Sequence, residues 1–160
     1  MLSYKVIESQ EGSLFIVTSN KDNLYGLDFF TKDIEEQDFD NDFLQENIVE
    51  LAIAKFSKNE SVQIRRVVEA CHKIFLDVIK GRFSDKIIYM SIDCNSAKCN
   101  LIEKLIYKNG NPDLVHLKVE NIVGQTFYFI FNEQESSSIE VINAITDYFA
   151  KEYNIKLSFS

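Results

Sequence analysis

One segment constrains the fold of this chain more than any other, an amphipathic stretch that begins at residue 64. Apolar side chains recur there at the spacing of one helix face, and charged side chains lie off that face. The apolar positions are Ile64, Val67, Val68, Cys71, Ile74, Phe75, Val78 and Ile79. Ser57 or Asn59 could cap this helix, and Gly81 is expected to stop it. A mostly apolar run at 86–92 follows and predicts a central strand, so the helix is expected to cross over a sheet.

The residues before this helix are predicted to form strands. Runs rich in β-branched and aromatic residues predict strands at 4–10, 13–20 and 23–30, with Glu11-Gly12 as a hairpin turn. Residues 47–56 are ambiguous. Strand-like alternation is shown by Val49, Leu51 and Ile53, whereas a helical spacing is shown by Leu44, Ile48, Leu51 and Lys55. We favour a strand.

The rest of the chain predicts two helices and further strands. Their expected ranges are a helix at 97–108, strands at 114–121 and 125–132 with Val123-Gly124 as the turn, a helix at 137–153, and a short strand at 156–160. Ser137 and Glu140 form a capping box at the start of the last helix. The order β-β-β-β-α-β-α-β-β-α predicts an α/β (α+β) fold with a mixed, mostly antiparallel central sheet. A chain of 160 residues suits one domain, 1–160.

The charge of the chain is unevenly placed. The sequence has 17 Lys+Arg and 25 Asp+Glu, a net charge of −8, and residues 1–60 hold 13 of the acids and only 5 of the bases. The densest part lies in the acidic segment 31–47 and contains Asp33, Glu35, Glu36, Asp38, Asp40, Asp42 and Glu46. These acids indicate either a solvated loop or a surface that steers a basic protein partner. Direct binding of nucleic acid is disfavoured, because phosphates require a basic surface.

Metal and disulfide chemistry find little support. The three cysteines lack a CxxC pair, and Cys71 falls on the apolar helix face, whereas Cys94 follows a strand end and is expected to be more accessible. Asp38-x-Asp40-x-Asp42 imitates the start of a calcium loop, but Phe43 and Val49 occupy the positions that require Gly and Glu. His72 and His116 have no second histidine at ligand spacing. Reduced thiols, no apolar run of about 18 residues and no secretory signal predict a cytoplasmic protein without a membrane span.

Aromatic residues are dense near the C-terminus. They are Phe127, Tyr128, Phe129 and Phe131 on one predicted strand, with Phe29, Phe30, Tyr148, Phe149 and Tyr153 elsewhere. These side chains either form core or, if Tyr128 and the last helix are uncovered, a partner or homodimer surface.

Residues 95–107 resemble a segment of the GNAT acyltransferase family. This stretch, Asn95-Ser-Ala-Lys-Cys-Asn-Leu-Ile-Glu-Lys-Leu-Ile-Tyr107, follows the strand end Ser91-Ile92-Asp93 and is similar to the family's N-x-x-A-x-x-L-Y-E-K-L-G-F. The matching positions are Asn95, Leu101, Glu103, Lys104 and Leu105, with Tyr107 at the aromatic position. Lys98, Ile102 and Ile106 depart from it, and Ile102 replaces the tyrosine that protonates the leaving thiolate. The resemblance covers about residues 4–132 and implies that the helix at 137–153 is an addition.

The turn that binds the cofactor pyrophosphate departs further from the family pattern. The family has R/Q-x-x-G-x-G/A there, whose glycines bring backbone N–H groups to the phosphates. Here the stretch is Phe56-Ser-Lys-Asn-Glu-Ser-Val-Gln-Ile64, which has no glycine and places Glu60 where an anion should bind. Lys58, Arg65 and Arg66 could neutralise part of this charge. We interpret the chain as a degenerate GNAT-like scaffold that has lost acetyl-CoA chemistry.

Two functions remain open. The first is a non-catalytic interaction module without a cofactor, similar to immunity, antitoxin or inhibitor proteins, that binds a basic protein partner through the acidic segment. The second is a divergent N-acyltransferase that binds acetyl-CoA or another acyl-CoA through Lys58, Arg65, Arg66 and Asn95, with Tyr107 or Cys94 as the acid. An open splay between the fourth and fifth strands, with N–H groups of 57–63 pointing outward, would favour the enzyme. A closed gap filled by side chains would favour the interaction module.

Overall fold

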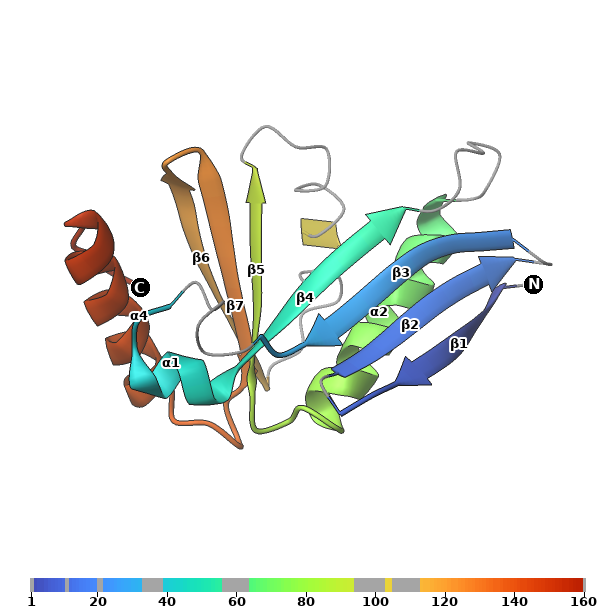
Figure 1. The fold of residues 1–160 in the computed structure, drawn as a ribbon, viewed down its shortest axis with the longest axis horizontal. Coiled ribbons are helices and arrows are strands. Elements are labelled where there is room, and N and C mark those ends of the chain that lie inside the picture. The colour runs from blue at the N-terminus through green and yellow to red at the C-terminus, as the bar shows by residue number, and fades with distance from the viewer. Residues whose placement is uncertain are drawn as a thin grey trace.

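The computed structural model describes residues 2–10, 12–19, 22–32, 39–55, 64–93, 103–104 and 113–159. Its elements are β1 (Leu2–Glu8), β2 (Gly12–Ser19), β3 (Asp22–Phe30), α1 (Asp42–Asn47), β4 (Ile48–Lys55), α2 (Ile64–Lys80), β5 (Ile87–Asp93), β6 (Leu114–Ile122), β7 (Gln125–Asn132) and α4 (Ser138–Tyr153). The strands form one seven-stranded sheet in the order β1-β2-β3-β4-β5-β7-β6 (Figure 1). Only the β4–β5 pair is parallel in this described sheet. The predicted mixed, mostly antiparallel sheet is confirmed.

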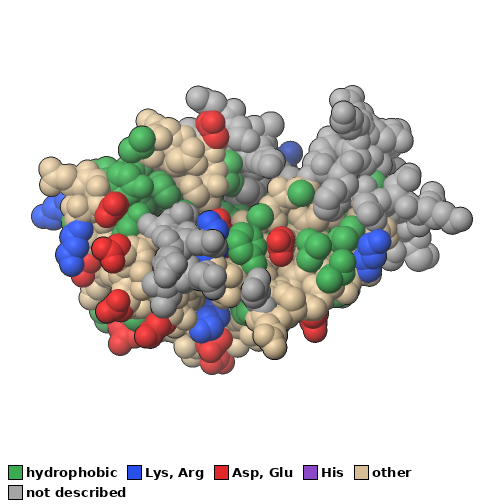
Figure 2. Space-filling model, in the orientation of Figure 1, with side chains coloured by type: hydrophobic (Ala, Val, Ile, Leu, Met, Phe, Trp, Pro, Cys, Tyr) green, Lys and Arg blue, Asp and Glu red, His purple; other side chains and the backbone are tan. Residues whose placement is uncertain are grey.

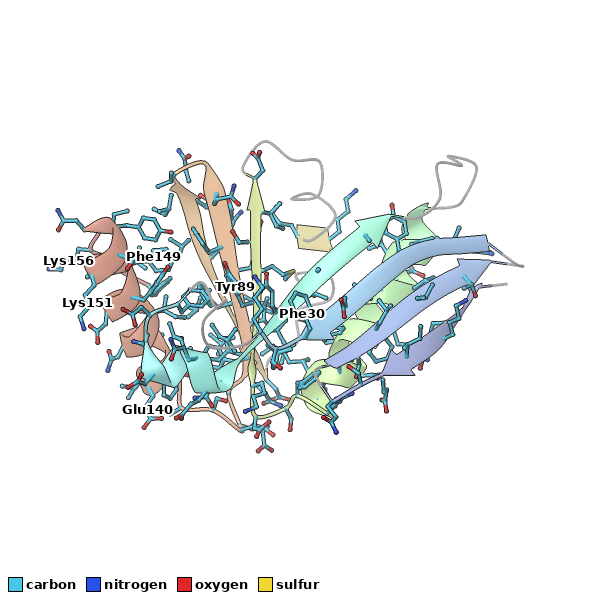
Figure 3. The ribbon with its side chains drawn as sticks, viewed as in Figure 1. Phe30, Tyr89, Glu140, Phe149, Lys151 and Lys156 are labelled. Atoms are coloured by element: carbon cyan, nitrogen blue, oxygen red, sulfur yellow. The ribbon has the colours of Figure 1, made fainter. Side chains whose placement is uncertain are left out.

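The two faces of the sheet bury two separate hydrophobic clusters. On one face α2 packs against the sheet in a cluster that draws side chains from β2 to β7, and its own buried side chains include Ile74, Phe75 and Ile79. On the other face α4 and α1 pack against β5–β7. Figure 3 shows Tyr89 and Phe149 between α4 and the sheet, with Lys151 and Lys156 pointing outward. Because side chains alternate along a strand, neighbouring strand residues enter different clusters.

The strand β7 separates its aromatic side chains by this alternation. Phe127, Phe129 and Phe131 belong to the cluster under α4. Tyr128 belongs to the cluster under α2 and is only 1% exposed. The prediction of an uncovered surface shared by Tyr128 and the last helix is therefore wrong, because the two lie on opposite faces of the sheet and Tyr128 is buried.

The acidic segment 31–47 contains a helix that its charge pattern did not predict. Asn41 caps α1, since its side-chain oxygen accepts a hydrogen bond from Leu44 N at 3.0 Å. Leu44 is fully buried and Phe39 is nearly so. The segment is thus not a solvated loop throughout. The strand favoured for 47–56 is confirmed by β4, and the helical fit of Leu44 reflects its place in α1.

The other predicted elements agree with the structure within about two residues at their ends, a normal boundary difference. Gly81 stops α2 as predicted, since a Cβ there would lie 2.7 Å from the Asp77 carbonyl oxygen. Ser137 caps α4 by accepting from Glu140 N, and Asn154 ends it in the left-handed conformation. The predicted strand at 156–160 is wrong over 156–159, where Leu157 and Phe159 instead pack on the α4 cluster as irregular chain.

Some predictions fall partly or wholly outside the described residues. These include Glu11, the caps Ser57 and Asn59, and most of the helix at 97–108, of which residues 103–104 are described as helical. In the part of the chain that the structure describes, no helix is long and apolar enough to cross a membrane. The expectations of one domain over 1–160 and of a cytoplasmic location stay predictions.

Candidate functional site

A fork between β4 and β5 is the first candidate site. These parallel strands pair over three positions only, Ile48–Ile87, Val49–Ile88 and Glu50–Tyr89. Beyond them β4 continues along β3 to Lys55, while β5 continues along β7 to Asp93. Figure 1 shows the two strands diverging toward their C-terminal ends. The strands therefore splay apart, which is one part of the arrangement that would favour the enzyme; the other part, the N–H groups of 57–63, lies outside the described residues.

The side chains at the fork differ between the two faces of the sheet. Toward α2, Leu51, Ile53, Met90 and Ile92 are buried and apolar. On the opposite face the residues are small or polar and exposed, namely Ala52, Ala54, Ser91 and Asp93. The Ser91 hydroxyl donates to Gln125 Oε1 at 3.1 Å. A ligand that entered the fork would contact apolar side chains on the α2 side and small or polar, exposed side chains on the other side.

Two of the four residues predicted to hold a cofactor lie outside the described part of the chain. Lys58, Asn95 and residues 57–63 are outside it, as are the candidate acids Cys94 and Tyr107. Arg65 is described by its backbone in α2, and Arg66 is exposed in the first turn of the same helix. The structure therefore neither assembles nor separates the predicted anion site.

A polar network fastens residue 103 to the sheet beside the fork. Glu103 Oε1 accepts hydrogen bonds from Lys118 Nζ and, at 3.3 Å, from the Tyr128 hydroxyl. Lys118 also pairs with Glu120 at 2.7 Å and lies 5.7 Å from the centroid of the Tyr128 ring. The hydrogen bond from Lys118 lowers the pKa of the Glu103 carboxyl, and the two carboxylates raise the pKa of Lys118. Sequence analysis assigned Tyr128 to the aromatic set alone and missed this polar role.

The acidic segment is the second candidate site. Asp40, Asp42 and Glu46 are exposed around α1. The other predicted partner-binding acids, Asp33, Glu35, Glu36 and Asp38, lie outside the described residues. The described acids stand on a segment that is fixed to the body of the protein.

Aromatic contacts provide the first anchor of this segment. The Phe39 ring lies 4.7 Å from the Tyr89 ring, 4.7 Å from the Tyr148 ring and 5.8 Å from the Phe129 ring. Such contacts add about 0.5–1.5 kcal/mol each to the burial of the ring. Sequence analysis missed Phe39; its signal was an aromatic residue within an acidic run, two positions before a good helix cap.

Hydrogen bonds provide a second anchor. Gln45 Nε2 donates to the Phe39 carbonyl at 2.9 Å, and Asn47 Nδ2 donates to the Phe43 carbonyl at 2.8 Å. Lys86, at the start of β5, donates to the Glu46 carbonyl at 3.1 Å. The last contact ties the end of α1 to a distant part of the chain, so α1 is held from both ends.

The remaining candidates are the possible metal ligands and Cys71. Among the residues that the structure describes, no three His, Cys, Asp or Glu side chains are grouped so as to hold a metal ion. Cys71 is buried under α2, and burial raises the pKa of its thiol to about 12, so it is core as predicted.

Comparison with known proteins supports the fold and goes no further. No family model matches the chain, and no significant match occurs among curated proteins. An acetoin utilization protein from Exiguobacterium sibiricum 255-15 has a similar structure, with a TM-score of 0.59 and 12% identity over 91% of this chain and 72% of that one. Aminoglycoside acetyltransferase AAC(6')-Ib in complex with coenzyme A and kanamycin has a TM-score of 0.46 and 10% identity over 79% of this chain and 69% of that one. A chimera of spermidine N-acetyltransferase SpeG from Vibrio cholerae and hSSAT has a TM-score of 0.45 and 12% identity over 81% of this chain and 71% of that one.

These structural neighbours are GNAT acetyltransferases, and this chain has a GNAT-like fold. The last two scores lie below 0.5, so the fold assignment depends on the first neighbour and on the topology described above. Similarity at this identity concerns the fold alone, because one fold hosts many functions.

Proposed function

We propose that this chain is a protein-interaction module on a GNAT-like scaffold, which binds a basic partner protein in the manner of an immunity, antitoxin or inhibitor protein. One observation carries the proposal: Asp40, Asp42 and Glu46 are exposed on a segment that Phe39 and Leu44 anchor in the core. Acids held in place before binding lose less conformational entropy when a partner arrives. Their field also accelerates encounter with a basic surface.

The proposal extends to the whole acidic segment and requires no cofactor. Asp33, Glu35, Glu36 and Asp38 precede the anchored acids in the sequence and would add to the same field. The sequence around the expected cofactor turn supports a non-catalytic module, since 56–64 has no glycine and contains Glu60. Ile102 stands where the related enzymes have a tyrosine acid.

The test reverses the charge of the described acids. The triple variant Asp40→Lys, Asp42→Lys and Glu46→Lys is compared with Glu133→Lys, Glu135→Lys and Glu140→Lys, which are exposed acids near the start of α4. A partner captured with the wild-type chain is purified, and its affinity is measured by calorimetry at low and high salt. We expect the first variant to weaken binding by about tenfold or more, and binding to weaken with salt. Equal affinities of the two variants would contradict the proposal.

The fork between β4 and β5 favours a second candidate, a divergent acyl-CoA-dependent N-acyltransferase. Lys58, Arg65 and Arg66 would bind the phosphates of the cofactor, and Asn95 would contact its pantetheine arm. The fork leaves the two strands apart where such an arm would lie. When bound, an acyl-CoA would supply the activated acyl group.

Thermal melting distinguishes this candidate from the first. A ligand at 100 times its Kd adds about 2.7 kcal/mol, or several degrees for a chain of this size. The wild type is melted with and without millimolar acetyl-CoA and desulfo-CoA. A shift that disappears in Arg65→Glu/Arg66→Glu but persists in Lys73→Glu/Lys80→Glu, two exposed positions on the same helix, would support the enzyme. No shift would exclude acyl-CoA binding under these conditions.

A further inference from the structure

The face of β1–β4 opposite α2, called here the outer face, presents apolar side chains. Three rows cross the strands there, given by the strand pairing as Ile7–Leu14–Asp28–Ala52, Lys5–Ile16–Gly26–Ala54 and Gly12–Phe30–Glu50. Ile7 is 56% exposed, Ala52 and Ala54 are exposed, and Leu14 and Phe30 are partly exposed. Ile16, in the middle row, is buried. Figure 2 shows hydrophobic side chains gathered over these strands, with acidic ones among them.

One carboxylate stands in the middle of this apolar surface. Asp28 has Leu14 and Ala52 as its cross-strand neighbours, and Gly26 and Phe30 lie on either side of it along β3. None of these four neighbours is basic. Lys32, two residues beyond Phe30, is paired with Glu50 at 3.0 Å. Partial burial raises the pKa of the Asp28 carboxyl, which is the expected effect of apolar surroundings on a charge.

A carboxylate in this position weakens the free protein and strengthens a complex with a cation. The apolar neighbours remove water from the charge without replacing its hydrogen bonds. An arriving ammonium or guanidinium group would restore those bonds in a site of lowered polarity, where charged pairs interact strongly. The surrounding apolar side chains would then be covered by the apolar part of the same ligand.

We propose that the outer face is the docking surface for a basic amphipathic helix of a partner protein, in which one Lys or Arg pairs with Asp28 and apolar side chains cover Ile7, Leu14 and Phe30. This inference rests on the proposed function and assigns its partner a specific shape and site. Asp28 is not one of the acids of segment 31–47, so the two sets of residues can be changed in separate variants.

The size of the outer face fits this occupant, and its described charged side chains are Asp28, Lys5 and the paired Lys32 and Glu50. Four strands span about 14 Å and the three rows span a similar length, which accommodates a helix about 10–12 Å wide. The exposed alanines of β4 have small side chains, which would let the backbone of a docked helix approach the strand closely. A second copy of the chain would bring its own net charge of −8 against an acidic N-terminal third, so a basic partner fits better.

The experiment uses the full chain and a designed helical peptide of leucine and lysine, about 18 residues or 27 Å long. A peptide with glutamate in place of lysine is the matched ligand control. Binding is measured by fluorescence anisotropy for the wild type, for Asp28→Asn and for Asp77→Asn, an exposed acid on α2 on the far side of the sheet. We expect binding to fall about tenfold or more in Asp28→Asn only.

A second measurement separates docking from folding. Asp28→Asn removes a desolvated charge at nearly constant shape, so its melting temperature should equal or exceed that of the wild type. In an NMR titration of the wild type, addition of the lysine peptide should lower the pKa of the Asp28 carboxyl, as a cationic partner does. A structural role for Asp28 would not respond to the peptide.

Each alternative outcome overturns the inference. The inference is wrong if the lysine peptide does not bind. It is also wrong if Asp28→Asn and Asp77→Asn bind this peptide with equal affinity, or if the wild type binds the lysine and glutamate peptides with equal affinity. Loss of binding in Asp40→Lys/Asp42→Lys/Glu46→Lys but not in Asp28→Asn would leave the proposed function standing and reject the outer face. A dimer of the free chain that Leu14→Arg dissociates would assign the face to a second copy instead.

Discussion

The ring of Phe39 packs edge-on against the ring of Tyr148, with 4.7 Å between the ring centroids. Phe39 belongs to the acidic segment, and Tyr148 belongs to α4, more than 100 residues later in the sequence. Both rings are buried on the same face of the sheet. This contact joins the acidic segment, our proposed partner surface, to the last helix of the fold.

Removal of this ring should therefore destabilise the protein and release the acidic segment. Phe39→Ala leaves a cavity between α1, α4 and β5, which costs about 3–5 kcal/mol. In a chain of this length each kcal/mol lowers the melting temperature by about 2–4 °C, so we expect a loss near 10 °C by calorimetry. Ile139→Ala is the control, because Ile139 is 73% exposed and should change stability little. Equal melting temperatures of the two variants would show that Phe39 is not an anchor.

Arg82 should stabilise the β1–β2 hairpin from outside it. Its guanidinium donates to the Ser9 carbonyl at 3.1 Å, to the Gly12 carbonyl at 3.4 Å and to the hydroxyl of buried Ser13. Replacement by methionine keeps most of the stem but removes the donor to the buried Ser13 hydroxyl, at a cost of about 1–3 kcal/mol. The Gly12 carbonyl keeps its hydrogen bond from Ser9 N at 2.9 Å. The exposed pair with Glu8, at 3.8 Å, should contribute little.

Hydrogen exchange measures this effect locally. In Arg82→Met, backbone amides of β1 and β2 should exchange faster, whereas amides of β6 and β7 should change little. Lys80→Met, an exposed position two residues earlier, serves as the control. Uniformly faster exchange across the sheet would mean that Arg82 acts on global stability and not on the hairpin.

The β6–β7 turn offers a stabilising substitution. Val123 and Gly124 have φ angles of 51° and 76°, as a type I′ hairpin turn requires. A β-branched residue is strained there, and Val123 is 82% exposed, so its side chain gains little from burial. Val123→Asn should raise the free energy of unfolding by about 1 kcal/mol, measured by urea denaturation. Gly124→Ala should lower it, and a gain in that variant would contradict the turn type.

The sequence predicts the sheet well because its signals are local. The alternation in β2 and β7 and the apolar run in β5 need only a few neighbouring residues to be recognised. The topology in turn predicts the fork, since β4 and β5 are linked by the α2 crossover. The face on which each strand residue lies is harder, because it depends on which helix covers that face. Tyr128 is an example. The alternation of side chains along β7 places it on the opposite face from Phe127 and Phe129, but only the packed structure shows that α2 covers Tyr128 and α4 covers the two phenylalanines.

The candidate surfaces could be predicted only in part. The exposed acids Asp40, Asp42 and Glu46 follow from the charge pattern, but their anchor Phe39 depends on contacts with β5, β7 and α4, which no local pattern contains. Asp28 was not singled out, because its apolar setting arises from cross-strand neighbours, Leu14 and Ala52, that are distant in the sequence. A strand register must be known before such a charge stands out.

The last prediction concerns acid stability and depends on His116. This side chain lies on β6, and burial is the main cause that lowers its pKa below the usual value, with a further contribution from the nearby charge of His72 on α2. The unfolded chain therefore takes up a proton at a higher pH than the folded chain does. The contribution of His116 to the free energy of unfolding should be constant above about pH 7.5 and should fall as the pH drops below about 6.5.

Urea denaturation between pH 7.5 and 5 measures this slope, which for one group is at most about 1.4 kcal/mol per pH unit. His116→Leu should flatten the profile, because the neutral side chain takes up no proton in either state. His72→Gln should flatten it only slightly, since it removes the smaller of the two causes and leaves the burial of His116 unchanged. If His116→Leu retained the full slope between pH 6.5 and 5, the acid sensitivity would belong to another group and not to His116.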